Sequence, residues 1–268
     1  MSLRKTLAGA VVALGMAMGS NAFAATIVNL GFAIDSSGSV SADDFTLQKK
    51  GLAGALSLIP TDDPNVQYRI GVVSFGSDVA TVQAPTLVTS AADIGAIQTA
   101  ILNHAKINTG STQTGLVINE MVSQFSAVSD LKDTLTIFNI STDGVPCCQG
   151  NAQALAEAAS LAALAAGVNS IGVELVGNHS QSSVDNMLAV AGPGAVRLDN
   201  PADLASLDVT TQGFVLKVNN FADYQGAIQA KVQKIVDDTN PVPLPASLPL
   251  LLGALGLVGG LRLRRRAA

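Results

Sequence analysis

Apolar runs of strand length alternate with segments of helical periodicity along most of this 268-residue chain, and this alternation limits its possible folds more than any other feature. The first run, residues 27–34, is almost continuously apolar, as expected of a strand that is buried on both faces. The next segment has apolar residues on one helical face from Phe45 to Ile59 and ends at Pro60. Strands that alternate with helices predict an open, mainly parallel α/β sheet.

The same periodicities predict the remaining elements. Further strands are expected at residues 66–75, 134–140, 168–176 and 195–198, and a weaker Thr- and Val-rich stretch at 79–88 is expected to form an edge strand through a hairpin. Helices are expected around residues 94–101, from near Gln113 to Val128, at 151–166, at 183–190, from Pro201, and at 221–236.

The two ends of the chain carry patterns that are typical of export signals. Arg4 and Lys5 precede a short apolar run and an Ala-Phe-Ala sequence, which predicts a signal peptide over residues 1–24. An N-terminal membrane anchor is the alternative, although the run is short for one. Residues 241–261 are uncharged and an arginine-rich end follows, so we expect a membrane span whose basic end stays in the cytoplasm.

The body between these ends is strongly acidic. Six of the 15 basic residues lie in the terminal segments, so the body carries 9 basic against 20 acidic residues and a net charge of −11. This balance argues against binding of nucleic acid and favours attraction of cations. We therefore divide the chain into a signal peptide (1–24), one domain (25–237), a linker (238–246) and a C-terminal membrane segment (247–268).

Polar loops follow two of the predicted strands, and a third opens a predicted helix. Asp35 begins the first loop, Asp143 lies in the second, and a Ser- and Thr-rich loop at 109–115 opens the helix. Ligands bind at the carboxyl ends of the strands in such sheets, so these loops are expected to meet. Carboxylates and hydroxyls without His or Cys suit Mg²⁺, Mn²⁺ or Ca²⁺. The alternative is that the same residues only cap helices and form Asx turns.

These loops, in this order, resemble the von Willebrand factor type A domain with its metal-ion-dependent adhesion site, over about residues 26–236. The resemblance implies a three-layer, doubly wound, Rossmann-like α/β fold with one antiparallel edge strand. It assigns metal ligands to five residues of the three loops: Asp35, Ser37, Ser39, Thr112 and Asp143. Thr114 is the alternative to Thr112 in a shifted register, and Ser111 stands where this family usually has Gly.

The resemblance also implies a function. The cation, Mg²⁺ first and Mn²⁺ or Ca²⁺ otherwise, would be completed by a carboxylate from a protein or matrix ligand. The chain lacks the phosphate-binding glycine motifs and the G-x-S-x-G nucleophile motif, so we expect a binding protein and not an enzyme. Two alternatives stay open: a metal-assisted hydrolase, and a structural matrix protein without metal-dependent binding.

The C-terminal segment resembles a second family feature. Residues 242–246 read Val-Pro-Leu-Pro-Ala, followed by the apolar span and the arginine cluster, similar to the VPLPA variant of the PEP-CTERM sorting signal. This resemblance implies a Gram-negative bacterium in which an exosortase-type membrane protease removes the tail and passes the protein to the cell surface or extracellular matrix.

The only two cysteines of the chain, Cys147 and Cys148, are adjacent and follow Asp143 closely. Adjacent Cα atoms are only ~3.8 Å apart, less than the usual disulfide separation of about 4.4–6.8 Å, which opposes a disulfide between them. The oxidising conditions that an exported protein meets favour one. Free thiols, intermolecular pairing and metal contact are the alternatives. If the disulfide forms, we expect a stiff apolar platform beside the ion. His104 and His179 are expected to be solvated loop residues.

Overall fold

The computed structural model describes residues 25–107 and 110–240. The strands are β1 (Thr26–Asp35), β2 (Val66–Phe75), β3 (Val79–Val88), β4 (Leu135–Thr142), β5 (Ser170–Val176), β6 (Val196–Leu198) and β7 (Phe214–Val218). The helices are α2 (Ala42–Leu56), α3 (Ala91–Asn103), α4 (Thr114–Ser126), α5 (Ala152–Ala166), α6 (Gln181–Ala191), the 3₁₀ helix η1 (Pro201–Ser206) and α7 (Phe221–Thr239).

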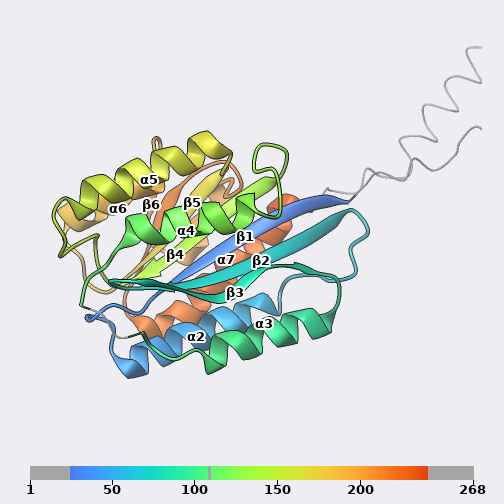
Figure 1. The fold of residues 1–268 in the computed structure, drawn as a ribbon, viewed down its shortest axis with the longest axis horizontal. Helices are drawn as coiled ribbons and strands as arrows, with labels where there is room; N and C mark the ends of the chain where they lie inside the picture. Colours follow the sequence, from blue (N-terminus) through green and yellow to red (C-terminus); the bar gives the residue numbers. More distant parts are fainter. Residues whose placement is uncertain (1–24, 108–109, 241–268) are drawn as a thin grey trace, which may run out of the picture.

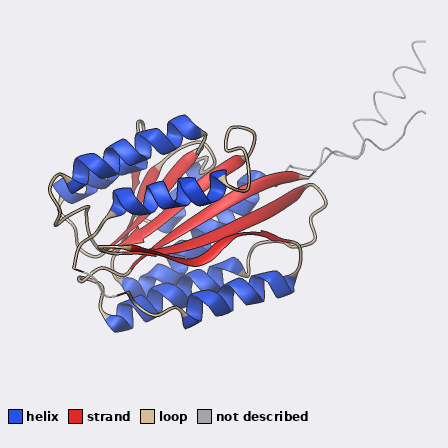
Figure 2. Ribbon diagram, viewed as in Figure 1, coloured by secondary structure: helices blue, strands red, loops and turns tan. Residues whose placement is uncertain are grey.

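All seven strands form one sheet in the order β3-β2-β1-β4-β5-β7-β6 (Figures 1 and 2). Every neighbouring pair is parallel except β2 and β3, which are antiparallel. The predicted fold class, a mainly parallel α/β sheet with one antiparallel edge strand, is therefore confirmed. The parallel strands bring their carboxyl ends to a single edge of the sheet, which we call the carboxyl edge.

Helices cover both faces of the sheet (Figure 2). Helices α2, α3 and α7 pack on one face, and α4, α5 and α6 pack on the other (Figure 1). Side chains of β1 alternate between the two cores: Leu30 and Ile34 join the first, whereas Ala33 joins the second. A strand buried on both sides has no polar face, which explains why its sequence is an apolar run.

Several elements differ from the prediction. The strand β7, which lies between β5 and β6, was not predicted. Its five residues include Lys217, and periodicity alone does not separate so short a run from a loop. Helix α4 ends at Ser126, so Val128 lies beyond it and is 47% exposed. Strand β4 runs on to Thr142, so that Asp143 follows it directly.

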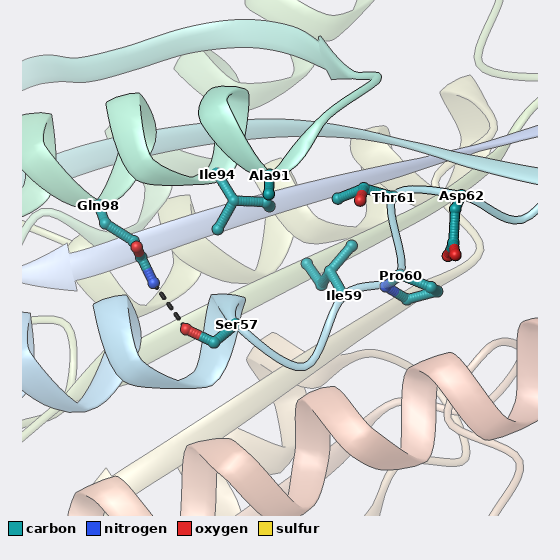
Figure 3. Close-up of a pocket in the computed structure, with 8 residues that line it drawn as sticks. All are labelled: Ser57, Ile59, Pro60, Thr61, Asp62, Ala91, Ile94 and Gln98. Carbon is teal, nitrogen blue, oxygen red and sulfur yellow. Dashed lines mark hydrogen bonds between the residues drawn. The ribbon is translucent and has the colours of Figure 1, made fainter.

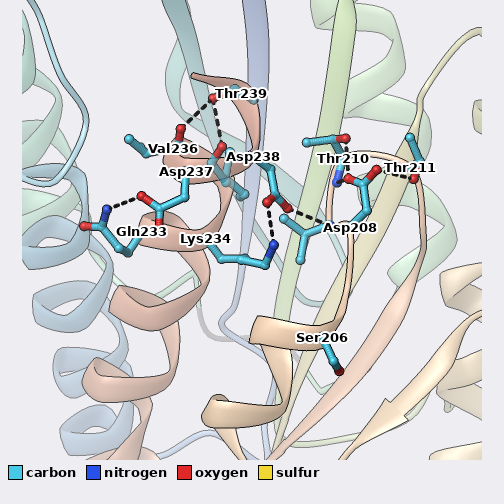
Figure 4. Close-up of polar contacts among 12 residues, drawn as sticks. Ser206, Asp208, Thr210, Thr211, Gln233, Lys234, Val236, Asp237, Asp238 and Thr239 are labelled. Atoms are coloured by element: carbon cyan, nitrogen blue, oxygen red, sulfur yellow. Dashed lines mark hydrogen bonds and ion pairs between the residues drawn. The ribbon is translucent and has the colours of Figure 1, made fainter. Parts of the chain in front are cut away.

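Helix α7 continues past the predicted domain boundary at residue 237. Figure 4 shows Lys234 and Asp238 forming an ion pair, and Asp238 also accepts a hydrogen bond of 3.2 Å from the backbone N–H of Val209. The hydroxyls of Thr239 and Tyr68 are 2.7 Å apart. These contacts extend the helix to Thr239, so the first two residues of the predicted linker (238–246) are helical.

The predicted export and sorting segments lie outside the described residues. These are the signal peptide at 1–24, the VPLPA motif at 242–246 and the C-terminal segment at 247–268. Within residues 25–107 and 110–240, none of the helices has the length and apolar character needed to cross a membrane.

Two glycines are expected to respond oppositely to replacement by Ala. Gly167 ends α5 with φ +116°, and a Cβ there would lie 2.6 Å from the backbone carbonyl of Leu131. Gly226 lies inside α7, and a Cβ there would meet nothing within 4 Å. We expect Gly167→Ala to lower the free energy of unfolding by about 1–3 kcal/mol. Gly226→Ala should raise it by up to about 1 kcal/mol. Urea unfolding of both variants tests this, and a loss of stability in Gly226→Ala would contradict it.

Candidate metal centre

The three polar loops do meet at the carboxyl edge. Asp35 is the last residue of β1, and Asp143 follows β4, its neighbour in the sheet. Ser41 caps α2 by accepting a hydrogen bond from the backbone N–H of Asp44, which ends the first loop and fixes its length. The third loop opens α4 and forms an isolated antiparallel bridge between Thr112 and Cys147.

A chain of hydroxyl contacts links the first loop to Asp143. The Oγ atoms of Ser37 and Ser39 are 3.1 Å apart, and Ser39 Oγ donates a hydrogen bond of 2.7 Å to Asp143 Oδ1. Three residues named from the sequence alone, Ser37, Ser39 and Asp143, therefore lie in one cluster with Asp35. Its oxygen atoms come from hydroxyl groups and carboxylates, and contacts across 104 residues of sequence hold it together.

Asp35 lies beneath this cluster with a fully buried side chain. Its Oδ1 accepts a hydrogen bond of 2.7 Å from the backbone N–H of Ser37, and its Oδ2 accepts one of 2.6 Å from Thr142 Oγ1. Burial raises the pKa of Asp35 to about 6, although both hydrogen bonds lower it. Burial likewise raises the pKa of Asp143. Both carboxylates would therefore gain from a nearby cation.

Thr112 approaches the same cluster from the third loop. Its backbone carbonyl accepts a hydrogen bond of 3.3 Å from the N–H of Cys147. Its hydroxyl faces the residue after Asp143, because a Cβ on Gly144 would lie 3.8 Å from Thr112 Oγ1. The alternative ligand, Thr114, has a buried hydroxyl with no hydrogen-bond partner among the described residues. The position of Thr112 favours it as the ligand, and Thr114 remains the alternative.

The side chain of Ser111, which replaces the Gly usual in this family, makes a contact that Gly could not make. Its Oγ lies 2.8 Å from Ser77 Oγ, and its backbone N–H donates to the same oxygen at 3.1 Å. The N–H of Gln113 donates to Gly76 O at 3.0 Å. The residues on both sides of Thr112 are thus attached to the loop between β2 and β3.

Lys106 is a residue at this site that sequence reasoning missed. Its ammonium group donates hydrogen bonds to the backbone carbonyls of Ser36 at 3.0 Å and Ser37 at 2.8 Å. Nothing in the sequence indicated this role, because the lysine lies about 70 residues away in a loop without periodicity.

A groove of about 350 Å³ opens beside Asp143. It is lined by side chains from the ends of three strands and the start of α2: Asp44, Asn178, His179, Asn219 and Phe221 are among them. Both histidines lie in loops, as expected, but each is half-buried and not fully solvated. His179 is half-buried in this groove with Nε2 2.9 Å from the carbonyl oxygen of Val176, and His104 packs against Phe45 with ring centroids 6.3 Å apart.

A second hollow, of about 440 Å³, lies between the end of α2 and the start of α3 (Figure 3). Asp62 is the only charged residue among those that line it. Gln98 closes one side by donating a hydrogen bond of 2.8 Å to Ser57 Oγ. None of the five candidate metal ligands lines this hollow, so it offers no comparable set of oxygen atoms.

Cys147 and Cys148 form a disulfide with a Cα–Cα separation of 3.7 Å. Of the four alternatives raised by the sequence, the structure therefore has the bond between neighbours. Cys148 is exposed and Cys147 is half-buried, so the disulfide lies on the rim of the candidate centre.

The donor set fits a hard divalent cation. Two carboxylates and several hydroxyls converge here, and oxygen ligands of this kind suit Mg²⁺, Mn²⁺ or Ca²⁺. In the part of the chain that the structure describes, no three His, Cys, Asp or Glu side chains gather as a metal site. Oxygen atoms other than carboxylates, such as the Ser and Thr hydroxyls of these loops, would therefore complete the coordination at this centre.

The raised pKa of Asp35 predicts a pH-dependent stability in the presence of EDTA. A carboxyl whose pKa in the folded protein is about 6, against 3.8 ordinarily, stabilises the fold when it is protonated. This contribution is complete below about pH 4 and is lost as the pH rises through 6, with an upper limit of about 3 kcal/mol. Between pH 5 and 7, urea unfolding should show a larger loss of stability in the wild type than in Asp35→Asn. Equal losses would contradict the buried, uncompensated carboxylate.

Comparison with known proteins gives a family match. The family model of the von Willebrand factor type A domain matches residues 29–228. No curated protein matches the chain in sequence.

Solved structures share the fold. Proximal thread matrix protein 1 from the mussel byssus has a TM-score of 0.58 at 16% identity, over 80% of this chain and 47% of that one. A structure of the same mussel protein with a zinc-occupied metal-ion-dependent adhesion site also has a TM-score of 0.58 at 16% identity, over 80% and 48% of the two chains. The pilus adhesin SpaC from Lactobacillus rhamnosus GG has a TM-score of 0.59 at 12% identity, over 82% and 31%. This chain thus spans less than half of each of these structures.

Proposed function

The chain belongs to the von Willebrand factor type A domain family, and on this basis we propose that it binds an acidic ligand through a divalent cation at the carboxyl edge. The proposed metal ligands are the five residues of the candidate centre: Asp35, Ser37, Ser39, Thr112 and Asp143. Mg²⁺ is the proposed ion, with Mn²⁺ and Ca²⁺ as alternatives that fit the same oxygen atoms.

The contact between Ser39 Oγ and Asp143 Oδ1 carries this proposal. It joins two loops that are far apart in sequence and brings hydroxyls and a carboxylate to one point. A cation held mostly by neutral hydroxyl oxygens keeps much of its positive charge, so it attracts a carboxylate from a partner. The ion would supply this electrostatic attraction, while the protein side chains orient it.

The groove beside Asp143 is the proposed continuation of the ligand surface. The side-chain amides of Asn178 and Asn219 are exposed there and make no hydrogen bond within the described part of the chain. His179 and Asp44 add an imidazole and a carboxyl group that can form hydrogen bonds. A ligand whose carboxylate reaches the ion could form hydrogen bonds in this groove, and these would contribute to its specificity.

We propose that the protein acts at the cell surface or in the extracellular matrix. The signal peptide and the VPLPA-type tail predicted from the sequence support export and processing by an exosortase-type protease. The described body begins with β1 and ends with α7 at the edge opposite the candidate centre (Figure 1). Attachment of the body to the membrane or matrix at either end would therefore leave the carboxyl edge accessible to a partner.

A binding role is proposed rather than catalysis. His179 lines the groove beside Asp143, and its Nε2 already contacts the carbonyl oxygen of Val176. Metal-dependent turnover of a phosphoester or peptide would favour the hydrolase alternative instead. Surface assembly that persists without metal binding would favour a purely structural matrix role.

The test is calorimetric titration of the fragment 25–240 with Mg²⁺, Mn²⁺ and Ca²⁺. This fragment contains every described element and both cores. Saturable binding of one ion supports the centre and justifies a search for carboxylate-bearing ligands. Absence of binding by the folded fragment would contradict the proposal. Thr112→Ala and Thr114→Ala then separate the two register alternatives, since only the true ligand should weaken binding strongly.

A further inference from the structure

We infer that the disulfide between Cys147 and Cys148 positions Thr112 and makes the metal affinity of the centre depend on dithiol–disulfide exchange. This inference rests on the proposed function, because it assumes that Thr112 contributes to a metal site. It adds a means of regulation: the oxidised protein would bind the cation more tightly than the reduced one.

The contacts of Thr112 point to Cys147. The backbone N–H of Cys147 donates to Thr112 O at 3.3 Å, and its Sγ lies 4.0 Å from Thr112 Oγ1. A disulfide sulfur has no hydrogen to donate, so the second distance is a packing contact. Among the described residues, these are the contacts that hold the carbonyl and the hydroxyl of Thr112 itself. The bonds to Gly76 and Ser77 hold only its two neighbours.

The disulfide restricts the backbone that makes these contacts. A bond between adjacent cysteines closes a small ring that includes their shared peptide group, so neither residue can rotate freely. Cys148 has φ +73°, a left-handed conformation that is uncommon for residues other than Gly. Opening the ring would free Cys148 to leave this conformation. Cys147 would then be free to move away from Thr112.

Reduction would also change the chemistry next to Thr112. A free thiol at Cys147 could donate a hydrogen bond to the Thr112 hydroxyl, which a disulfide sulfur cannot do because it has no hydrogen. The same loop begins at Asp143, four residues before Cys147. Movement of Cys147 would therefore affect the positions of two proposed ligands, Thr112 and Asp143.

The exchange step balances with a dithiol reductant. One reductant thiolate attacks Sγ of Cys148, which is an exposed residue, the S–S bond breaks, and Cys147 leaves as a thiolate that takes up a proton. The second reductant thiol then attacks the mixed disulfide, which releases Cys148 and leaves the reductant oxidised as a disulfide. The protein gains two thiols, and oxidation reverses the sequence.

The experiment compares Mg²⁺ affinity of the fragment 25–240 in its two redox states. Mg²⁺ is the probe because thiolates do not favour this hard cation. The protein is reduced with a dithiol, the reductant is removed without air, and mass spectrometry after alkylation confirms two free thiols. We expect binding that is about 10–100-fold weaker after reduction, as for loss of a group that orients a metal ligand, and full recovery after reoxidation.

Two variants separate positioning of Thr112 from a general structural effect. In Thr112→Ala, reduction should change the affinity little, because the residue on which the disulfide acts is gone. Gln149→Ala alters an exposed neighbour in the same loop and should keep the full redox response. Thermal unfolding of each form shows whether any lost binding is loss of fold.

The outcomes separate this inference from the proposed function. Equal Mg²⁺ affinity in the oxidised and fully reduced proteins would overturn the role of the disulfide and leave the metal centre standing. An unchanged redox response in Thr112→Ala would overturn the positioning of Thr112. If the oxidised protein binds none of the three ions, the proposed function itself fails, and this inference fails with it.

Discussion

Replacing Asp35 by Asn is expected to weaken divalent-cation binding by at least about 100-fold while leaving the fold intact. The substitution removes a negative charge beneath the proposed ion. The amide oxygen can still accept from Ser37 N–H, and the amide NH2 can donate to Thr142 Oγ1, whose hydroxyl also lies 3.0 Å from Gly144 O. Asp143→Asn should have an effect of similar size, because Asp143 is the second carboxylate of the centre and its Oδ1 accepts the hydrogen bond from Ser39 Oγ. Calorimetric titration with Mg²⁺ and Mn²⁺ measures both.

Asp63→Asn is the matched control for charge. Asp63 lies in the turn before β2, at the opposite edge of the sheet, and also accepts a hydrogen bond from a backbone N–H two residues later. The Asp63→Asn substitution changes the net charge of the acidic body by the same amount as Asp35→Asn or Asp143→Asn. A general electrostatic effect on ion binding would therefore appear in all three variants. If Asp35→Asn binds the ions as tightly as Asp63→Asn does, the candidate centre is not a metal site. Circular dichroism excludes unfolding as the cause of any loss.

Replacing Lys231 by Met is expected to lower the free energy of unfolding by about 3–5 kcal/mol. Lys231 of α7 and Glu174 of β5 form an ion pair, and their side chains are 0% and 1% exposed. The Lys231 Nζ also lies 5.9 Å from the centre of the Phe214 ring. Removal of the ammonium group leaves the carboxylate of Glu174 buried without a counter-charge, which is far more costly than loss of an exposed pair. Urea unfolding at pH 7 measures the difference.

The same helix supplies a control for this prediction. Lys234 pairs with Asp238 near the end of α7, where both side chains are partly exposed, so Lys234→Met should cost no more than about 1 kcal/mol. The double variant Lys231→Met with Glu174→Gln removes both charges and should recover part of the lost stability. If Lys231→Met lowers the free energy of unfolding no more than Lys234→Met does, the prediction of a large cost for breaking the buried pair is wrong.

Much of the fold could be predicted because strands and helices leave periodic traces in the sequence. The edge strand at 79–88 and the strand at 66–75 were predicted with their observed bounds. The strand β7 was not predicted, since its five residues, which include Lys217, are too few to show a clear hydrophobic periodicity. The predicted end of the domain at residue 237 was early, because the contacts that extend α7 come from Val209 and Tyr68, which lie far away in sequence.

The candidate centre was predictable for a different reason. In a parallel sheet the ends of consecutive strands return to the same edge, so Asp35 and Asp143 could be expected together before any contact was known. The sequence could not indicate Lys106 on the carbonyls of the first loop, or His179 in the groove beside Asp143. Both residues lie in loops, where no periodicity links position in the sequence to position in space.

The sequence by itself determined the alternation of strands and helices, the acidic character of the body, and the three loops that carry candidate ligands, because each is a local property of residue type and spacing. Only the tertiary structure decided that the hydroxyl of Thr112 lies near Gly144, which partner Glu174 has, and that Cys147 contacts Thr112. The physical reason is that these contacts join segments brought together by the packing of helices on the sheet. That packing fixes distances across the whole domain, whereas sequence patterns record only the burial of each segment.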